Sequence, residues 1–460
     1  MINNMISLVL FKNNLRFNDN DVLYEACLNE SKILPVFIYD DINTNKALGS
    51  SSKYWLHHSL NSLNKKLDNN LQFYRGNTLK IIDDLSNLHN IDNIFCEEPF
   101  LEQDIYIFEK LVVLCKEKNI RLHAKNCTLL WRPYHILKSD DTPYKVFTPF
   151  YRKGCLNSDS PKKPVGTPKN VNYLNCDNNT TLSQLNLLDK FPWYDKFDNL
   201  WTINEDFAIE EFKSFIITKV NDYKSERDFP ALEKNSKLSP YIRFGLISIN
   251  RMWHELNQLI PNKSIDHYKS ELGWREFSYY LLYHFPHLES KNMQSKFDNF
   301  EWENSNKYFN AWKTGQTGYP IVDAGMRELW QTGFIHNRTR MVVASFLVKN
   351  LLIDWRLGEK WFWDCLVDAD YASNVASWQW VAGTGADAAP YFRIFNPILQ
   401  GKKFDTEGKY IRKYVPELNL ISDKFLNEPW EIKHDLDYPD PIINYSYSRQ
   451  RALDKYEQIK

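Results

Sequence analysis

Apolar runs separated by helical patterns occupy the first quarter of the chain. The runs are Ile6–Phe11, Ile33–Tyr39, Leu71–Tyr74, Ile91–Cys96 and Ile120–His123, and clear helical patterns between them are Tyr54–Leu67 and Ile105–Lys116. Strands that alternate with helices at this spacing form right-handed βαβ units. The pattern therefore predicts an α/β domain with a five-stranded parallel, Rossmann-like sheet. It contains no G-x-G-x-x-G and no P-loop, so a dinucleotide or NTP site of those kinds is not expected.

The pattern changes twice after residue 130. Gly154–Pro192 holds four prolines and many Asn and Ser residues with little periodicity, which is typical of a segment that crosses between domains. From Trp201 onward the pattern is helical, with few β-branched runs. We therefore expect an α/β domain over residues 1–130, a linker over 131–200 and an all-α domain over 201–460.

One stretch of the helical half is apolar but bounded by charges. Met341–Ile353 is almost wholly apolar and, at 13 residues, too short to span a bilayer, so it predicts a buried helix. The polar residues around and after it are Arg338, Arg340, Asp354, Arg356, Asp368, Asp370 and Asn374. Buried charges must be paired or bound to something polar. This arrangement indicates a pocket for a large, flat ligand with polar edges.

Composition narrows the class of protein. The 460 residues carry a net charge of −1, so any nucleic-acid site must be a local basic patch, such as Lys224–Arg251 or Gly401–Lys413. The seven cysteines form no C-x-x-C pair and no His cluster has metal spacing, which argues against a metal site or a disulfide framework. The N-terminal apolar run resembles a first strand rather than a signal peptide. We expect a monomeric, soluble cytoplasmic protein without membrane segments.

Short motifs between Trp274 and Pro397 occur in a fixed order. They are WREF, TGYPIVDAGMREL, IHNRTRM, LIDWRLGE, DADYASN, WQW and GTGADAAPYFRIFNP. Weaker similarity continues to LRFNDND near the N-terminus and SRQRAL near the C-terminus. By these motifs the chain resembles the photolyase/cryptochrome family, flavoproteins that use blue light. Within that family it is most similar to the class I cyclobutane pyrimidine dimer (CPD) DNA photolyases.

The resemblance implies an enzyme that repairs CPDs in damaged DNA with light, bound to the nucleoid through that DNA. Splitting a dimer needs an electron delivered and later returned, which no side chain supplies, so a cofactor must. The implied cofactor is reduced FAD. Residues implied to bind it are Tyr223, Asn235, Ser236, Lys237, Leu238, Ser239, Tyr268, Arg340, Asp368, Ala369, Asp370 and Asn374.

Two of these assignments have simpler alternatives, and a third bears on which function the protein has. Asn235–Gly245 offers hydroxyls and a lysine at a predicted helix start, where phosphates bind well, but it also fits an ordinary N-cap. Arg340 and Asp368 fit a flavin edge or a structural ion pair, and the two are compatible. Asn374 matches the position beside the flavin nitrogen that changes protonation on reduction. A neutral amide there points to repair, whereas an Asp is found in plant cryptochromes.

The resemblance also assigns residues to electron transfer and to the substrate. Trp378, Trp355 and Trp302 match an electron-hopping chain from flavin to surface, although each alone also fits core packing. Glu271, Asn374 and Met341 are the implied catalytic residues. The implied DNA and dimer contacts are Arg227, Glu271, Trp274, Arg275, Asn337, Arg338, Trp380 and Gln400. Glu271 and Arg275 would alternatively form a surface pair four residues apart on a helix.

Subfamily and rival functions depend on a few positions. Six–four photolyases carry a His pair where this chain has Asn337 and Met341, and His336 is adjacent but out of position. The N-terminal domain of the family can hold a second, antenna chromophore of the folate or deazaflavin type. Gln103-Asp104 replaces the Asn-Glu of folate-binding members, so an empty and an occupied antenna site both stay open. A cryptochrome photoreceptor and a cofactor-free single-strand-binding protein are the rival functions. The short C-terminus favours the enzyme over the receptor, and the Asp-x-Asp and WQW motifs argue against the binding protein.

Overall fold

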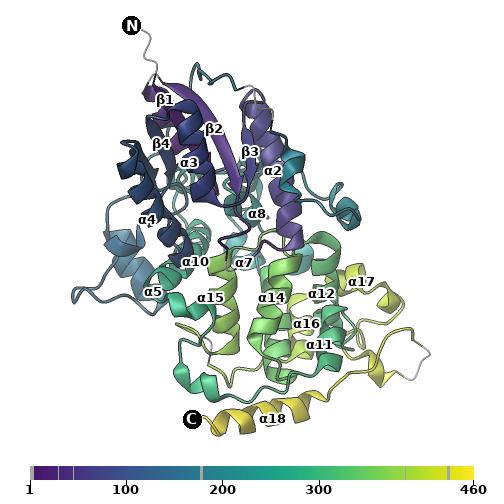
Figure 1. Ribbon diagram of the computed structural model, residues 1–460. Helices are drawn as coiled ribbons and strands as arrows, with labels where there is room; N and C mark the ends of the chain where they lie inside the picture. Colours follow the sequence, from purple (N-terminus) through teal and green to yellow (C-terminus); the bar gives the residue numbers. More distant parts are fainter. Residues whose placement is uncertain (1–4, 30, 45, 177–179, 389, 433–435) are drawn as a thin grey trace.

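The computed structural model describes residues 5–29, 31–44, 46–176, 180–388, 390–432 and 436–460. Figure 1 shows a sheet with its helices at one end of the molecule and a larger set of helices at the other. β1 (Ile6–Phe11) lies at one end of this view and α18 (Tyr445–Glu457) at the other. The molecule therefore consists of an N-terminal α/β part and a C-terminal helical part, as the sequence pattern predicts.

The sheet is five-stranded and parallel. Its strands are β1 (Ile6–Phe11), β2 (Lys32–Tyr39), β3 (Gln72–Arg75), β4 (Asn93–Glu97) and β5 (Arg121–Lys125), in the spatial order β3-β2-β1-β4-β5. Each neighbouring pair is parallel. The predicted sheet is confirmed, and the strand bounds differ from the predicted ones by no more than a few residues.

Two layers of helices cover the sheet. One layer contains α1 (Asp21–Leu28) and α2 (Ser50–Lys66), and the other contains α3 (Thr78–His89) and α4 (Glu102–Glu117). Side chains alternate between the faces of a strand, so neighbours on β1 enter different cores. Leu8 packs with residues of α3 and α4, whereas Val9 packs with residues of α1 and α2. The core that contains Val9 continues into the helical part. There the ring centroid of Trp55, on α2, lies 5.0 Å from that of Tyr241.

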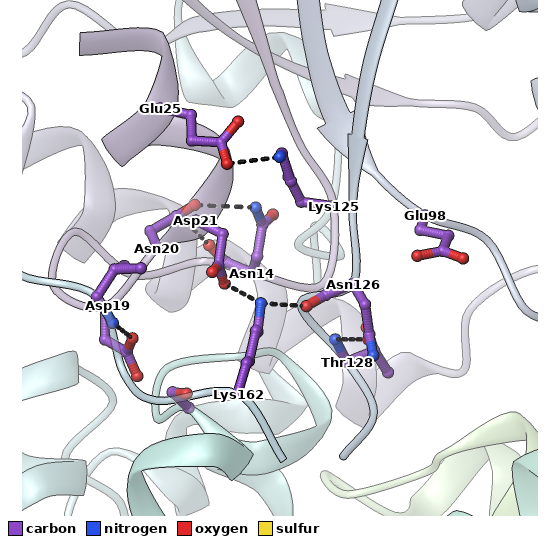
Figure 2. Close-up of polar contacts among 12 residues, drawn as sticks. Asn14, Asp19, Asn20, Asp21, Glu25, Glu98, Lys125, Asn126, Thr128 and Lys162 are labelled. Atoms are coloured by element: carbon purple, nitrogen blue, oxygen red, sulfur yellow. Dashed lines mark hydrogen bonds and ion pairs between the residues drawn. The ribbon is translucent and has the colours of Figure 1, made fainter. Parts of the chain in front are cut away.

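The segment between the two parts is anchored to the α/β part by polar contacts (Figure 2). Nζ of Lys162 lies 2.5 Å from the carboxylate of Asp21 and 2.5 Å from the backbone oxygen of Asn126. The backbone N–H of Val165 donates to Asp19 at 2.6 Å. Regular structure is short here, with α5 covering Phe147–Pro149. An irregular segment thus lies fixed along the domain that precedes it.

The C-terminal part is built from helices joined by turns and short 3₁₀ segments. Its helices are α6 (Glu205–Thr218), α7 (Tyr223–Glu226), α8 (Ser239–Arg243), α9 (Ile249–Asn257), α10 (Lys263–His284), α11 (Asn306–Lys313), α12 (Pro320–Thr332), α13 (Asn337–Ser345), α14 (Trp355–Cys365), α15 (Tyr371–Ala382), α16 (Pro397–Phe404), α17 (Lys409–Tyr414) and α18 (Tyr445–Glu457). The described residues contain no helix that is both long and apolar enough to cross a membrane. The predicted all-α domain is confirmed.

The buried helix predicted over Met341–Ile353 is only partly correct. α13 ends at Ser345 and is followed by a π-helical turn over Phe346–Asn350. Leu352 then has a φ of +52°, which lies outside the range of an α-helix, so the helix cannot continue through it. The segment is buried as expected, but the α-helix covers only its first residues, and a π-helical turn, which is wider than an α-helical one, forms most of the rest.

Candidate functional site

A cavity of about 540 Å³ lies in the helical part, between α8, α10, α13 and α15. This volume is within the range of sites for cofactor-sized ligands. The predicted site residues that line it are Tyr223, Arg227, Asn235, Ser236, Lys237, Leu238, Ser239, Tyr268, Glu271, Trp274, Arg275, Asn337, Arg340, Met341, Asp368, Ala369, Asp370, Asn374, Trp378 and Trp380. The structure therefore brings together all the predicted cofactor-binding residues and most of the predicted substrate-binding ones.

Two helices supply much of this lining by their periodicity. On α10, Tyr268, Glu271 and Arg275 are three and four residues apart, which places them on one face. On α15, Asn374 and Trp378 follow the N-cap residue Asp370 at intervals of four. Side chains at this spacing lie above one another along a helix. Each helix thus presents several functional groups to the same space.

Asp370 is the N-cap residue of α15 and joins the start of this helix to α10. Its carboxylate accepts the backbone N–H of Ser373 at 2.8 Å, which caps the helix, and the hydroxyl of Tyr279 at 2.6 Å. Burial alone would raise the pKa of Asp370, but the nearby Arg275 and Arg243 outweigh it and hold that pKa below its usual value. Asp370 is therefore a buried carboxylate whose charge is balanced by two arginines.

Arg340 and Asp368 form the ion pair that the sequence suggests. Nη2 of Arg340 lies 2.8 Å and 3.1 Å from the two carboxylate oxygens of Asp368. Nε of Arg340 donates to the backbone oxygen of Ile335 at 2.8 Å, which fixes the guanidinium plane. The hydroxyl of Ser239 donates to Asp368 at 2.5 Å and so joins α8 to this pair. The cavity edge is thus a fixed row of a hydroxyl, a carboxylate and a guanidinium.

The segment predicted to bind phosphate is irregular rather than capped. α8 has five residues, and its N-cap position is Leu238, which makes no side-chain capping bond. The ordinary N-cap considered from sequence is therefore wrong. Lys237 has a φ of +52°, so the backbone turns sharply before α8. The hydroxyl of Tyr268 donates to Ser236 at 3.2 Å and holds this turn against α10.

These groups fit FAD as the resident cofactor. The side-chain oxygen of Asn235 is shielded from solvent and has no hydrogen-bond partner among the described residues, as expected where a ligand supplies the partner. Hydroxyls of Ser236 and Ser239 and the cation of Lys237 lie in the same wall and match a diphosphate. The Arg340–Asp368 pair offers a donor and an acceptor to a flat polar edge. The donor set therefore matches a dinucleotide with a polar ring system.

The amide of Asn374 has a defined orientation. Its Nδ2 donates to Oε1 of Glu359 at 2.7 Å and to the backbone oxygen of Glu359 at 3.1 Å. Both amide hydrogens are therefore used outside the cavity, and Oδ1 stays available as an acceptor. Glu359 is on α14 and was not predicted from sequence, because its partner lies on another helix.

The predicted substrate side of the cavity is aromatic. The ring of Trp274 stacks on Phe147 with centroids 3.9 Å apart and planes 11° apart. Phe147 belongs to α5 in the interdomain segment, so this segment supports the cavity wall. Trp380 is half-buried and lines the cavity from α15. The two tryptophans present flat surfaces on which bases can stack.

Glu271 is paired with Arg227 rather than with Arg275. Nη2 of Arg227 donates to Glu271 at 3.0 Å, and Nη1 lies 2.9 Å from Nε2 of His267. Burial, helped by Arg227, lowers the pKa of His267, so its ring is neutral at pH 7. The surface pair of Glu271 with Arg275 that the helix spacing allows is therefore wrong. Arg227, predicted as a DNA contact, is mostly enclosed by this pairing.

Arg275 lines the cavity, but its guanidinium makes contacts on the side of the α/β part. Its Nη1 donates to the backbone oxygen of Thr128 at 2.8 Å and lies 3.3 Å from Glu276. Glu276 in turn accepts the backbone N–H groups of Leu130 and Trp131 at 2.8 and 3.2 Å. Although Arg275 lines the cavity, its guanidinium joins α10 to the α/β part. The substrate role of Arg275 stays a prediction.

Two other predicted contacts lie outside the cavity lining. Arg338 pairs with Asp228 at 2.5 Å and lies over the ring of Phe404, 4.3 Å from its centroid. Gln400 is half-buried on α16. Neither residue is among those that line the cavity. Their roles as DNA contacts stay predictions.

His336 has a structural role beside the cavity. It is the N-cap residue of α13, and its Nδ1 accepts the backbone N–H of Arg338 at 3.2 Å. Burial lowers the pKa of His336 to about 4, so the ring is neutral and cannot act as a cation at pH 7. It does not line the cavity, in agreement with its being out of position for proton donation.

The three predicted relay tryptophans differ in their surroundings. Trp378 lines the cavity and its ring contacts Phe362 at 5.0 Å and Trp312 at 6.3 Å. Trp355 is fully buried and donates to Asn292 at 3.0 Å. Trp302 is half-buried, with Phe300 at 4.5 Å. Trp378 and Trp355 are buried and Trp302 is only partly so, and the relay stays a prediction.

A second cavity of about 280 Å³ lies under the carboxyl ends of the strands. Such ends are where open α/β sheets bind ligands. Segments that follow β1, β2 and β4 line it, and Lys12 there lies 2.5 Å from Asp104. Gln103 and Asp104, singled out from sequence, both line it. Arg243 and Asp370 line both cavities, so the two share a wall.

Several lining residues were missed from sequence although signals for some existed. Arg243 lies in the SPYIRFG segment, and its Nε donates to the backbone oxygen of Ala369 at 3.0 Å. Phe147 does not line the cavity itself but stacks on the lining residue Trp274; it lies in a segment without periodicity, so nothing in the sequence marks this contact. The described residues contain no group of three His, Cys, Asp or Glu side chains arranged to hold a metal ion.

Comparison with known proteins agrees with this geometry. The sequence model of DNA photolyase matches residues 7–169, and that of the FAD-binding domain of DNA photolyase matches residues 268–458. A deoxyribodipyrimidine photo-lyase of Agrobacterium fabrum is 40% identical over 471 residues, which is 98% of each chain.

Solved structures extend the likeness to the whole fold. A bacterial class III photolyase from Agrobacterium tumefaciens is 39% identical, with a TM-score of 0.95 over 100% of this chain and 98% of that one. An archaeal photolyase from Sulfolobus tokodaii, described with two FAD molecules, is 31% identical, with a TM-score of 0.86 over 99% of this chain and 100% of that one. This protein therefore belongs to the DNA photolyase family, and its helical part carries the FAD-binding domain of that family.

Proposed function

We propose that this protein repairs cyclobutane pyrimidine dimers in DNA by light-driven electron transfer from reduced FAD. The observation that carries the proposal is the single cavity of about 540 Å³ that gathers FAD-type groups and base-stacking groups. The polar row of Ser239, Asp368 and Arg340 lies in the same lining as the aromatic surfaces of Trp274 and Trp380. A cofactor held on the first set and a flipped-out dimer held on the second would meet within one cavity.

The chain supplies binding, orientation and exclusion of water. Reduced FAD held here would supply the photo-excited electron and would accept it again after the dimer has split. Ser236, Lys237 and Ser239 would bind its diphosphate, and Arg340 with Asp368 would bind its polar ring edge. Asn374 offers an acceptor to the ring nitrogen that gains a proton on reduction.

The substrate must leave the duplex to enter the cavity. Enzymes that act on a base in a duplex flip it out, photolyases among them. Trp274 and Trp380 would stack on the flipped bases, and Met341 and Asn337 would contact them at the rim. Glu271 can accept hydrogen bonds from base N–H groups, and Arg227, which this ion pair mostly encloses, would hold the Glu271 carboxylate in place.

Two finer assignments belong to this proposal. The class I likeness rests on sequence motifs, whereas the bacterial relative of TM-score 0.95 is described as class III, so the class is left open. The second cavity would hold an antenna chromophore, because it lies at the strand ends and shares Asp370 with the first. The archaeal relative described with two FAD molecules supports a second bound chromophore.

Glu271→Ala tests the proposal. Losing a hydrogen bond to a charged group costs about 1.5–3 kcal/mol, so dimer binding should weaken roughly 10- to 150-fold. The measurement is thymine-dimer binding and loss under blue light, with the flavin reduced beforehand. Glu255→Ala is the matched control, because Glu255 pairs with Arg251 at 2.8 Å on α9 at similar exposure but does not line the cavity.

The outcomes separate repair from signalling. We expect the wild type and Glu255→Ala to repair dimers alike, and Glu271→Ala to bind them weakly with an unchanged flavin spectrum. Equal affinity and yield in all three would remove Glu271 from the substrate site. No repair by the wild type would overturn the enzyme proposal and favour a photoreceptor.

A further inference from the structure

The orientation of Asn374 depends on a carboxylate that lies outside the cavity lining. Glu359 receives both hydrogens of the Asn374 amide, one on Oε1 and one on its backbone oxygen. If the amide were turned over, its oxygen would face the carboxylate, with two acceptors and no proton between them. A charged Glu359 therefore fixes the amide with its oxygen available to the cavity.

Lys46 supplies the charge that balances Glu359. Lys46 lies between β2 and α2, and its Nζ forms an ion pair with the same Oε1 atom that binds Asn374. The ammonium also lies 4.7 Å from the ring centroid of Trp363 and 5.3 Å from that of Tyr371. The Glu359 side chain is only 9% exposed, and no other cation forms a salt bridge with it among the described residues. Without a cation, a buried carboxylate is strongly disfavoured.

We propose that Lys46 is a positioning residue of the FAD site, acting from the α/β domain through Glu359 on Asn374. While Glu359 is held as a carboxylate, Asn374 can present only an acceptor. An acceptor at this place favours the protonated, reduced form of the ring nitrogen over the unprotonated, oxidised form. The inference rests on FAD binding and on the placement of Asn374 and is independent of which lesion the protein repairs.

The same lysine also belongs to the second cavity. Lys46 lines that cavity, whereas Asn374 lines the first, and Glu359 stands between them. The ion pair thus connects the walls of two sites through one carboxylate. A lysine that served only to hold the domains together would not need to meet the oxygen that binds the Asn374 amide.

The test measures the midpoint reduction potential of bound FAD in Lys46→Met, Lys46→Arg and a control, Lys66→Met. Lys66 also crosses between domains, since its Nζ lies 2.7 Å from Asp206, but this pair is exposed and touches neither cavity. In Lys46→Met the reduced-to-oxidised ratio at a fixed potential should fall about tenfold, which is about 30 mV for a two-electron couple. Lys46→Arg should restore the wild-type potential, and Lys66→Met should leave it unchanged.

A second readout separates positioning from stability. Urea unfolding should show that Lys46→Met and Lys66→Met both lose stability, although only the first changes the potential. If Lys46→Met does not retain FAD, Glu359→Gln serves instead, because a glutamine can accept as well as donate and so frees the Asn374 amide. The proposal is overturned if Lys46→Met, or Glu359→Gln in its place, shifts the potential no more than Lys66→Met. It is also overturned if Lys46→Arg shifts it as far as Lys46→Met.

Discussion

The two cavities are built in different ways. The first takes its lining from helices, so that α10 and α15 each present several side chains to it. The second takes its lining from segments that follow separate parallel strands, each of which contributes a few residues. In the first, the Arg340–Asp368 pair and the orphan oxygen of Asn235 provide several polar groups for one ligand. In the second, Lys12 and Asp104 form an ion pair with each other.

The difference indicates where the molecule tolerates change. A helix-lined cavity depends on ion pairs that cross between helices, so the loss of one charge disturbs both the ligand and the packing. A strand-end cavity depends on loops, which can vary without moving the sheet. We therefore expect the largest effects on FAD binding at the first cavity, an effect on stability alone at the junction of α10 with the α/β domain, and the smallest effects at the shared wall.

Asp368→Asn should have the largest effect. Asp368 is buried, and its loss leaves Arg340 without its carboxylate partner. Removing one partner of a buried pair costs about 3–5 kcal/mol, and because Arg340 is partly exposed we expect about 3 kcal/mol. FAD affinity should fall roughly 100-fold, measured as the flavin-to-protein ratio after dialysis and by titration with FAD.

A matched ion pair gives the control for this variant. Arg327 and Glu417 lie 2.8 Å apart and are similarly enclosed, but they do not line either cavity. Glu417→Gln should lower stability while FAD affinity stays at the wild-type value. Retention of FAD by Asp368→Asn with an unchanged dissociation constant would show that the polar row does not bind the cofactor.

The second prediction concerns pH and the junction of α10 with the α/β domain. Burial raises the pKa of Glu276 from 4.5 to about 7, against the opposing effect of Arg275 and two backbone N–H groups. The folded protein therefore binds a proton here more tightly than the unfolded chain. This carboxyl favours folding most below pH 4.5, and that contribution is lost as pH rises to about 7, with a total near 3 kcal/mol.

Glu276→Gln should remove this dependence, because glutamine does not ionise. The free energy of unfolding of the variant relative to wild type should rise by up to about 3 kcal/mol between pH 4.5 and pH 7.5. Urea unfolding at several pH values measures it, with Glu255→Gln as the control on a partly exposed pair. Parallel curves for wild type and Glu276→Gln would mean that Glu276 is ionised throughout this range.

Much of the first cavity could be predicted from the sequence because its residues lie in contiguous motifs. Asp370, Asn374 and Trp378 are four residues apart, so one predicted helix places them together. Arg340 and Asp368 were paired correctly because each is a charge next to an apolar run. The parallel sheet followed in the same way from the alternation of apolar runs and helical patterns.

Contacts between distant segments were not predictable in this way. Glu359 binds Asn374 from another helix, and Lys46 reaches Glu359 from the other domain. Two glutamates on α10, Glu271 and Glu276, lie close enough in sequence to pair with Arg275. The contact of Arg275 with the backbone of Thr128 draws its guanidinium away from Glu271, and the sequence does not reveal this contact. The turn after α13 escaped prediction because an apolar run does not distinguish an α-helix from a π-turn.

The smallest predicted effect tests whether the shared wall belongs functionally to both cavities. Tyr279 lines the second cavity and donates to Asp370, which lines both, at 2.6 Å in a buried position. Tyr279→Phe removes this donor and leaves the ring in place. A hydrogen bond to a charged acceptor contributes about 1.5 kcal/mol at the low end of its range, and Arg275 and Arg243 still balance the charge.

Because Asp370 caps α15, the loss should reach the first cavity as well. We expect Tyr279→Phe to lower FAD affinity about tenfold, since α15 also carries Asn374 and its start would be held less firmly. Tyr280→Phe is the control, because Tyr280 is buried on the same helix and its hydroxyl donates to the backbone of Ile136 at 2.8 Å, away from both cavities. Tyr279→Phe should lose about 1.5 kcal/mol of stability in urea unfolding and Tyr280→Phe about 1 kcal/mol, and only Tyr279→Phe should bind FAD more weakly. Equal FAD affinity in the two variants would show that the wall separates the cavities without coupling them, and the second cavity could then be altered without affecting the first.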